Sequence, residues 1–125
     1  MNLDQTMQFI AEADDNTLFI LWTNADPITA DLMVFMYAEN SMKYHEWDHI
    51  IIIIWGATAR LAAENIQIRS KILYLRETGV HFTACITCAM ELGVKEQLES
   101  LGVDLVKWLD PLTAVLKGNK KLITV

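Results

Sequence analysis

The sequence predicts a single-domain α/β protein, with a three-layer α/β/α arrangement around a parallel sheet of five strands. Apolar segments typical of strands alternate with helical segments along the chain, and this order is typical of parallel sheets. The apolar run at 18–22 is typical of a strand that is buried on both faces. A later strand contains five consecutive isoleucines, whose β-branched side chains favour the extended conformation. The length of 125 residues suits one domain.

The first sixteen residues are predicted to form a helical appendage, and residues 17–125 to form the α/β domain. Leu3, Met7 and Ile10 are spaced as i, i+4 and i+7, which places them on one face of a short amphipathic helix. The pattern leaves open whether this helix packs on its own subunit or on a neighbour.

The first half of the domain alternates strand and helix. Asp26 and Pro27 provide a helix N-cap followed by a proline at the first helical position. Asn65 provides a break and a new cap between two later helices. The elements expected on this basis are a strand at 18–22, a helix at 27–42, a strand at 50–55, and helices at 58–64 and 66–78.

Glycines divide the second half of the domain. Gly79, Gly102 and Gly118 each stand where a helical pattern ends. Asp110 and Pro111 repeat the pattern of a cap followed by proline. The elements expected here are a strand at 80–84, one helix at 86–101, a strand at 103–108, a helix from 110 to 118, and a last strand at 122–125.

Composition excludes several classes of partner. The net charge is −6 and the lysines and arginines are scattered, so neither nucleic acid nor an anionic membrane surface is an expected partner. The longest apolar run, Ile50 to Ala57, is too short to span a bilayer. Because Met1 to Gln5 also lack a basic targeting segment, the predicted location is the cytoplasm.

Ligands of parallel sheets bind where the strands end. The residues that follow the first two long strands, Thr23, Asn24, Gly56 and Thr58, are therefore expected near a common site. The two threonines and the asparagine suit a polar pocket and a helix cap equally well. Arg60, in the following helix, either stabilises a thiolate at this edge or is simply solvated. No glycine-rich phosphate loop is present, so no nucleotide cofactor is expected.

Cys85 and Cys88 carry the most specific chemistry in the chain. They follow the third strand and open a helix, where the helix dipole favours a thiolate. Cys85 is therefore the predicted nucleophile, Thr87 can donate its hydroxyl to the same sulfur, and Cys88 can attack whatever Cys85 carries. The alternative is that both are small buried apolar side chains. A zinc site needs two more ligands and no second cysteine pair exists, so no metal is expected.

His45 and His49 match the spacing of the His-Glu-x-x-His motif of zinc peptidases. That motif requires both imidazoles on one face of a helix. His49 runs directly into the isoleucine strand, so the segment is predicted to be a polar turn before a strand.

The segment from Thr83 to Val94, which contains Cys85 and Cys88, resembles the cysteine loop of the DsrE/DsrF-like family of small sulfur-relay proteins. Residues 21–24, 55–56, 79–80 and 122–125 agree with it, and the resemblance covers about residues 17–125. It implies the same five-stranded fold and a homo-oligomer, a trimer or a hexamer. It also implies a persulfide on the cysteine that lies eight residues before a glycine, the spacing of Cys85 and Gly93.

Three functions follow. The first is an intracellular sulfur carrier or sulfurtransferase that holds a persulfide on Cys85 and exchanges it with donor and acceptor proteins. The second is a dithiol–disulfide redox module that uses Cys85 and Cys88, because the second cysteine departs from single-cysteine relay proteins. The third is a non-catalytic oligomeric binding protein of the same fold. None of the three requires a cofactor.

Overall fold

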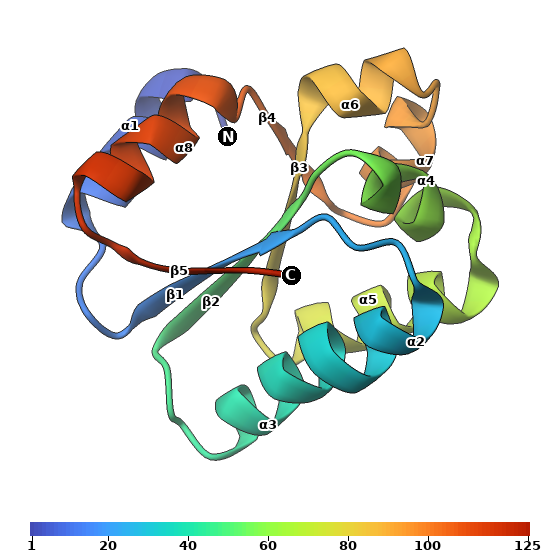
Figure 1. Ribbon diagram of the computed structural model, residues 1–125, viewed down its shortest axis with the longest axis horizontal. Helices are drawn as coiled ribbons and strands as arrows, with labels where there is room; N and C mark the ends of the chain where they lie inside the picture. Colours follow the sequence, from blue (N-terminus) through green and yellow to red (C-terminus); the bar gives the residue numbers. More distant parts are fainter.

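The computed structural model describes residues 1–125, and a five-stranded sheet forms its centre (Figure 1). All strand pairs are parallel, and the strand order is β4-β3-β2-β1-β5. The predicted single-domain α/β fold is confirmed. The strands are β1 (Thr17–Trp22), β2 (His49–Ile54), β3 (His81–Cys85), β4 (Asp104–Val106) and β5 (Lys121–Thr124).

Helices cover both faces of the sheet, in unequal numbers. One face carries α1 (Leu3–Glu12) and α8 (Leu109–Lys117), which lie side by side (Figure 1). None of the helices is both long and apolar enough to cross a membrane. The other face carries α2 (Pro27–Thr29), η1 (Ala30–Phe35), α3 (Met36–Lys43), α4 (Ala57–Glu64), α5 (Ile66–Glu77), α6 (Ile86–Glu91) and α7 (Lys95–Ser100).

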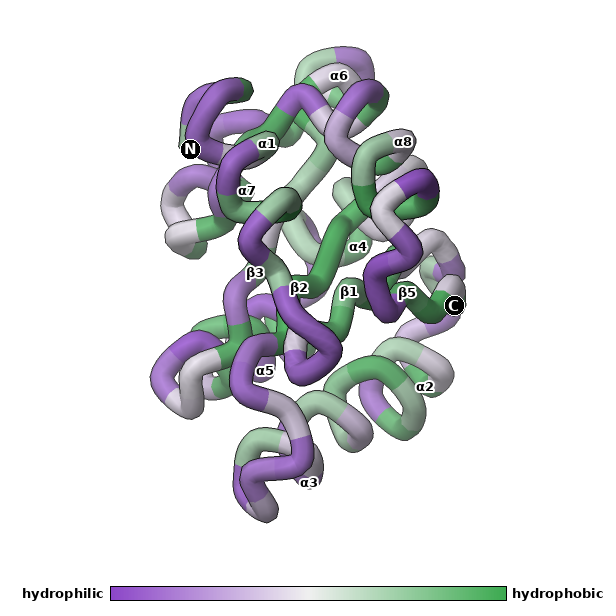
Figure 2. The backbone as a smooth tube through the Cα atoms, turned by 90° about the vertical axis from the view of Figure 1, so that its left-hand side faces the viewer, coloured by the Kyte–Doolittle hydropathy of each residue, from purple (hydrophilic) through white to green (hydrophobic).

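Strand β2 supplies side chains to both cores, which explains its run of isoleucines. Ile50, Ile52 and Ile54 belong to the larger core under the seven helical segments. Ile51 and Ile53 belong to the smaller core under α1 and α8. All five are at most 2% exposed. In Figure 2, β1 and β2 are coloured as hydrophobic at the centre of the molecule, with hydrophilic segments around them.

Helix α1 is an integral part of the domain, which corrects the expected appendage at 1–16. Its residue Ile10 is 2% exposed and belongs to the smaller core. Phe9 packs edge-on against Phe19 of β1, with ring centroids 6.3 Å apart. Asn2 caps the helix by accepting the Gln5 backbone N–H at 2.8 Å. The helix therefore packs on its own subunit through Phe9 and Ile10, whereas Leu3 and Met7 of the expected stripe are 41% and 37% exposed.

The predicted helix at 27–42 forms, with one internal irregularity. Asp26 caps it as expected, accepting the Ile28 backbone N–H at 3.3 Å, and Pro27 is the first helical residue. The middle segment η1 adopts π-helical hydrogen bonding between the α-helical segments α2 and α3. No residue pattern in this helix indicates the π segment.

Three expected boundaries are wrong. The strand expected at 103–108 is the shorter β4, Asp104–Val106, and Trp108 is the N-cap of α8. The single helix at 86–101 is divided into α6 and α7, because Gly93 adopts a φ of +68°, which ends the first piece. Met90, in the first piece, is 63% exposed, whereas Val94 and Leu98 after the break are buried. Helix α8 begins at Leu109, so Asp110 lies inside the first turn and does not cap the helix.

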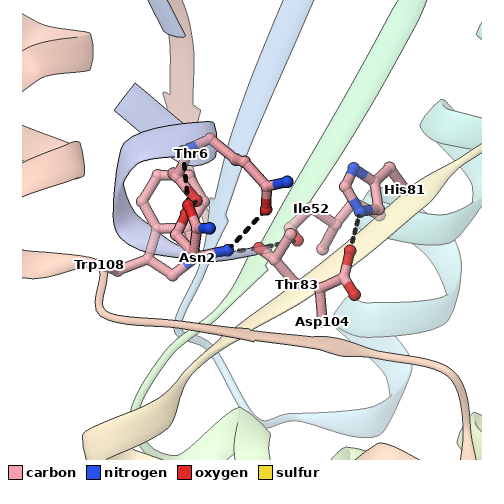
Figure 3. A network of polar contacts seen from close by, with 8 residues as sticks. Asn2, Thr6, Ile52, His81, Thr83, Asp104 and Trp108 are labelled. Carbon is pink, nitrogen blue, oxygen red and sulfur yellow. Dashed lines mark hydrogen bonds and ion pairs between the residues drawn. The ribbon is translucent and has the colours of Figure 1, made fainter. Parts of the chain in front are cut away.

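A buried polar network joins β2, β3 and the start of α8 (Figure 3). The indole N–H of Trp108 donates to the Thr83 hydroxyl at 3.1 Å, and this hydroxyl donates to the Ile52 carbonyl at 3.0 Å. His81 is half-exposed, and its Nε2 lies 2.6 Å from Oδ2 of Asp104. In this network, the Thr83 hydroxyl is the hydrogen-bond partner of the buried Trp108 indole N–H.

Replacing Thr83 by valine keeps the shape of the side chain and leaves the Trp108 N–H unpaired. Because a buried unpaired donor retains its full desolvation cost, we expect a loss of about 1–3 kcal/mol in the free energy of unfolding. Urea denaturation measures this loss. Thr113→Val, which removes an exposed hydroxyl on α8, is the matched control and should change stability little. Equal stability of T83V and wild type would contradict the role of the network.

Candidate functional site

A groove of about 660 Å³ lies at the carboxyl ends of β1, β2 and β3. Residues of α4 and of α6 line it, together with Ala25 from the loop after β1. The position agrees with the rule that ligands of parallel sheets bind where the strands end. The residues that line the groove are Ala25, Gly56, Ala57, Arg60, Leu61, Thr87, Cys88, Glu91 and Leu92.

Cys88 is the thiol that lines this groove. Its Sγ accepts a hydrogen bond from the backbone N–H of Gly56 at 3.3 Å. Gly56 has φ +69° and ψ −132°, a conformation that residues with a Cβ rarely adopt. The glycine that ends β2 thus presents a main-chain donor to a thiol on α6.

Cys85 lies behind Cys88 and is only 3% exposed. It is the last residue of β3 and the N-cap of α6, and it does not line the groove. Both cysteines are free thiols. The structure therefore brings the two predicted cysteines to one place, but it exposes Cys88 where the sequence indicated Cys85 as the reacting thiol.

The surroundings of Cys88 favour its protonated form. Partial burial raises the pKa of the Cys88 thiol, and the adjacent Cys85 thiol raises it further. The hydrogen bond from Gly56 acts in the opposite direction, since it stabilises the thiolate. A protonated thiol resists adventitious oxidation and needs a reaction partner that draws its proton away.

The other predicted site residues divide into two groups. Gly56 and Thr87 line the groove beside Cys88. Thr58 is fully buried instead, and its hydroxyl lies 2.8 Å from the Trp22 carbonyl oxygen, where it joins the ends of β1 and β2. The hydroxyl of Thr23 donates to the Val125 carbonyl at 3.0 Å, and the side-chain oxygen of Asn24 accepts the Asp26 N–H at 2.9 Å.

Thr23, Asn24 and Thr58 therefore shape the sheet edge and do not contact the groove. The two expected roles were a polar pocket and a helix cap, and these side chains have neither, because the N-caps of the following helices are Asp26 and Gly56.

Two charged residues also line the groove. Arg60 stands on α4, four residues after Gly56, and forms an exposed ion pair with Glu64 at 3.4 Å. Glu91 stands on α6, three residues after Cys88, and was not predicted as a site residue. Its position follows from helical spacing, since residues i and i+3 share one helix face. Helical periodicity from Cys88 was thus the signal that could have identified Glu91.

The histidines of the His-Glu-x-x-His segment do not share a helix. Helix α3 ends at Lys43, His45 lies in the following turn with φ +54°, and His49 opens β2. No group of three histidine, cysteine or carboxylate side chains in residues 1–125 is arranged to hold a metal ion.

Comparison with known proteins gives one informative similarity. No family model matches the chain, and no curated protein does either. A solved structure of a conserved protein of unknown function from Bacteroides thetaiotaomicron is 34% identical in sequence. The similarity covers 91% of this chain and 100% of that chain, with a TM-score of 0.87. The chain therefore belongs to the same family as this conserved Bacteroides protein.

Proposed function

We propose that this chain is a sulfur carrier of the DsrE/DsrF-like kind, which holds sulfane sulfur as a persulfide at the Cys85–Cys88 pair and passes it to a partner. One observation carries the proposal: a free thiol, Cys88, lines a groove at the carboxyl edge of a parallel sheet, with a second free thiol directly behind it. The groove volume of about 660 Å³ is in the range of small-molecule sites.

Exposure favours Cys88 as the thiol that accepts sulfur, with Cys85 as the second thiol. In the first step, the Cys88 thiolate attacks the sulfane sulfur of a donor R–S–SH. The donor S–S bond breaks, R–S⁻ leaves with the displaced electron pair, and Cys88 becomes a persulfide. An acceptor thiolate then removes the outer sulfur and regenerates the Cys88 thiol.

The second thiol supports an alternative outcome at the same site. If the Cys85 thiolate attacks the inner sulfur of the Cys88 persulfide, the Cys85–Cys88 disulfide forms and HS⁻ leaves. Cys85 is the N-cap of α6 and Cys88 lies three residues later in its first turn, so the two thiols are within one helical turn of each other. A dithiol–disulfide redox module therefore remains the second candidate function.

Intact mass spectrometry distinguishes these functions. After reduced protein is incubated with inorganic polysulfide, we expect a gain of about 32 Da, one sulfur atom, that maps to Cys88. Cys88→Ser should abolish the gain, and Cys85→Ser should preserve it, since the groove thiol remains. If Cys85→Ser abolishes the gain and Cys88→Ser preserves it, Cys85 is the residue that carries the persulfide.

A loss of about 2 Da with a Cys85–Cys88 link, and no persulfide in either variant, would favour the redox module. Unchanged mass with both thiols unreactive would contradict both functions and would leave a binding protein whose cysteines only pack.

The pH dependence of thiol alkylation tests the environment of Cys88. Because only the thiolate reacts and the pKa of Cys88 is raised, its alkylation rate should rise at a higher pH than that of free cysteine. Cys85→Ala removes one cause of the raised pKa, so the midpoint should move to lower pH. Rates with iodoacetamide, mapped by peptide mass across pH, give both midpoints. A Cys88 midpoint below that of free cysteine would contradict the proposed environment.

Exposed apolar side chains on the helix at 27–43 support a homo-oligomer. Ile28, Leu32 and Met36 follow one another at intervals of four residues and are 68%, 56% and 55% exposed. A row of this kind is typical of an interaction surface. We propose that it is the contact between copies of this chain.

Leu32→Glu should lower the mass of the assembly toward the monomer, because it places a charge in the centre of that row. Size-exclusion chromatography with light scattering measures the mass. Leu116→Glu changes an equally exposed leucine on the opposite face of the sheet and is the control. A monomeric wild-type protein, or an unchanged mass of L32E, would contradict the proposed contact.

A further inference from the structure

The two walls of the groove carry opposite charges. Arg60 belongs to α4 on one wall, and Glu91 belongs to α6 on the other, as the neighbouring positions of these helices in Figure 1 indicate. Cys88, one turn before Glu91, opens into the same space. The groove thus combines a cation, an anion and a thiol, although the remaining lining is largely apolar.

Both charges are available to a ligand. Arg60 pairs with Glu64 at 3.4 Å, but the two side chains are 59% and 57% exposed, and such pairs are weak in water. The guanidinium has five N–H donors, so it can bind a second carboxylate without releasing the first. Glu91 is exposed and takes part in none of the ion pairs of the chain.

The apolar part of the lining suits a short carbon skeleton. Ala25, Ala57, Leu61 and Leu92 provide methyl and methylene surface between the charged walls. A ligand that fills this space therefore has a small apolar body and a charge of each sign. An amino acid with a thiol side chain has these features, and its persulfide brings the sulfane sulfur as well.

We propose that the sulfur donor of this site is the persulfide of a zwitterionic low-molecular-weight aminothiol, a molecule with one carboxylate, one ammonium group and one sulfane sulfur. Arg60 binds the carboxylate, Glu91 binds the ammonium group, and the hydropersulfide lies against Cys88. This assignment rests on the proposed persulfide chemistry of Cys88 and adds the identity of the donor class.

The transfer balances without a further reactant. The Cys88 thiol and the donor R–S–SH give the Cys88 persulfide and the free aminothiol R–SH. The S–S bond of the donor breaks, one S–S bond forms at Cys88, and the proton of Cys88 ends on the leaving thiolate. The aminothiol that leaves is the same zwitterion without its outer sulfur.

Charge disfavours thiosulfate as the specific donor of this site. Thiosulfate is a dianion, and it would approach Glu91 in a chain whose net charge is −6. An uncharged alkyl persulfide would fit the apolar lining but would contact neither Arg60 nor Glu91 through a charge.

Three donors and two variants test the assignment. The donors are cysteine hydropersulfide, its N-acetyl derivative, which lacks the ammonium charge, and its methyl ester, which lacks the carboxylate. The variants are Glu91→Gln and Arg60→Gln, and the readout is the rate at which Cys88 gains a sulfur atom, followed by mass. Glu96→Gln on α7 and Lys117→Gln on α8 remove exposed charges outside the groove and are the controls.

We expect E91Q to slow transfer from cysteine hydropersulfide and from the methyl ester by about threefold to fivefold, and to leave the N-acetyl donor unaffected. R60Q should slow sulfur transfer from cysteine hydropersulfide and from the N-acetyl donor to a similar degree, and should leave transfer from the methyl ester unaffected. The two control variants should transfer at the wild-type rate.

Transfer from all three donors at rates that neither variant changes would overturn the donor assignment and leave the persulfide function intact. Failure of Cys88 to gain sulfur from these donors and also from inorganic polysulfide would overturn the proposed function itself.

Discussion

Burial of β2 on both of its faces is the constraint on which the rest of the structure depends. Its isoleucines alternate between the two cores, so the strand fixes the position of the helices above and below the sheet. Its neighbours β1 and β3 pair with it in parallel, which brings their carboxyl ends to one edge. Two residues after the last isoleucine, Gly56 donates its N–H to Cys88. The most hydrophobic segment of the chain therefore leads directly into the candidate site, and the packing of the strand fixes where Gly56 lies.

The sequence was most informative where one local signal decides the structure. The strand positions, the caps at Asp26 and Asn65 and the parallel sheet follow from apolar runs and N-cap chemistry, which act over a few residues. The break at Gly93 was missed because an apolar stripe continues across it with helical spacing, while the backbone turns at the glycine. The π segment η1 and the packing of α1 depend on contacts with distant residues, so no local pattern specifies them.

The sequence predicts where the candidate site lies, but it does not predict what each residue does there. The rule that ligands bind at strand ends groups Gly56, Thr87 and Cys88, and these three line one groove because parallel pairing fixes where strands end. It could not separate groove residues from residues that support the backbone, since Thr58 and Cys88 both follow strands that end at this edge. Which of the two cysteines faces the groove depends on the orientation of the first turn of α6. Cys85 is the N-cap of this helix and is buried.

The partner of the Cys88 sulfur is a peptide N–H, and this has an evolutionary consequence. A main-chain donor is present whatever side chains surround it, provided that a glycine maintains the backbone conformation at position 56. Lineages are then free to exchange the residues of the two walls, and with them the preferred ligand, without disturbing the anchoring of the thiol. Divergence among relatives should therefore concentrate at the rim of the groove, while Gly56 and Cys88 change together or not at all.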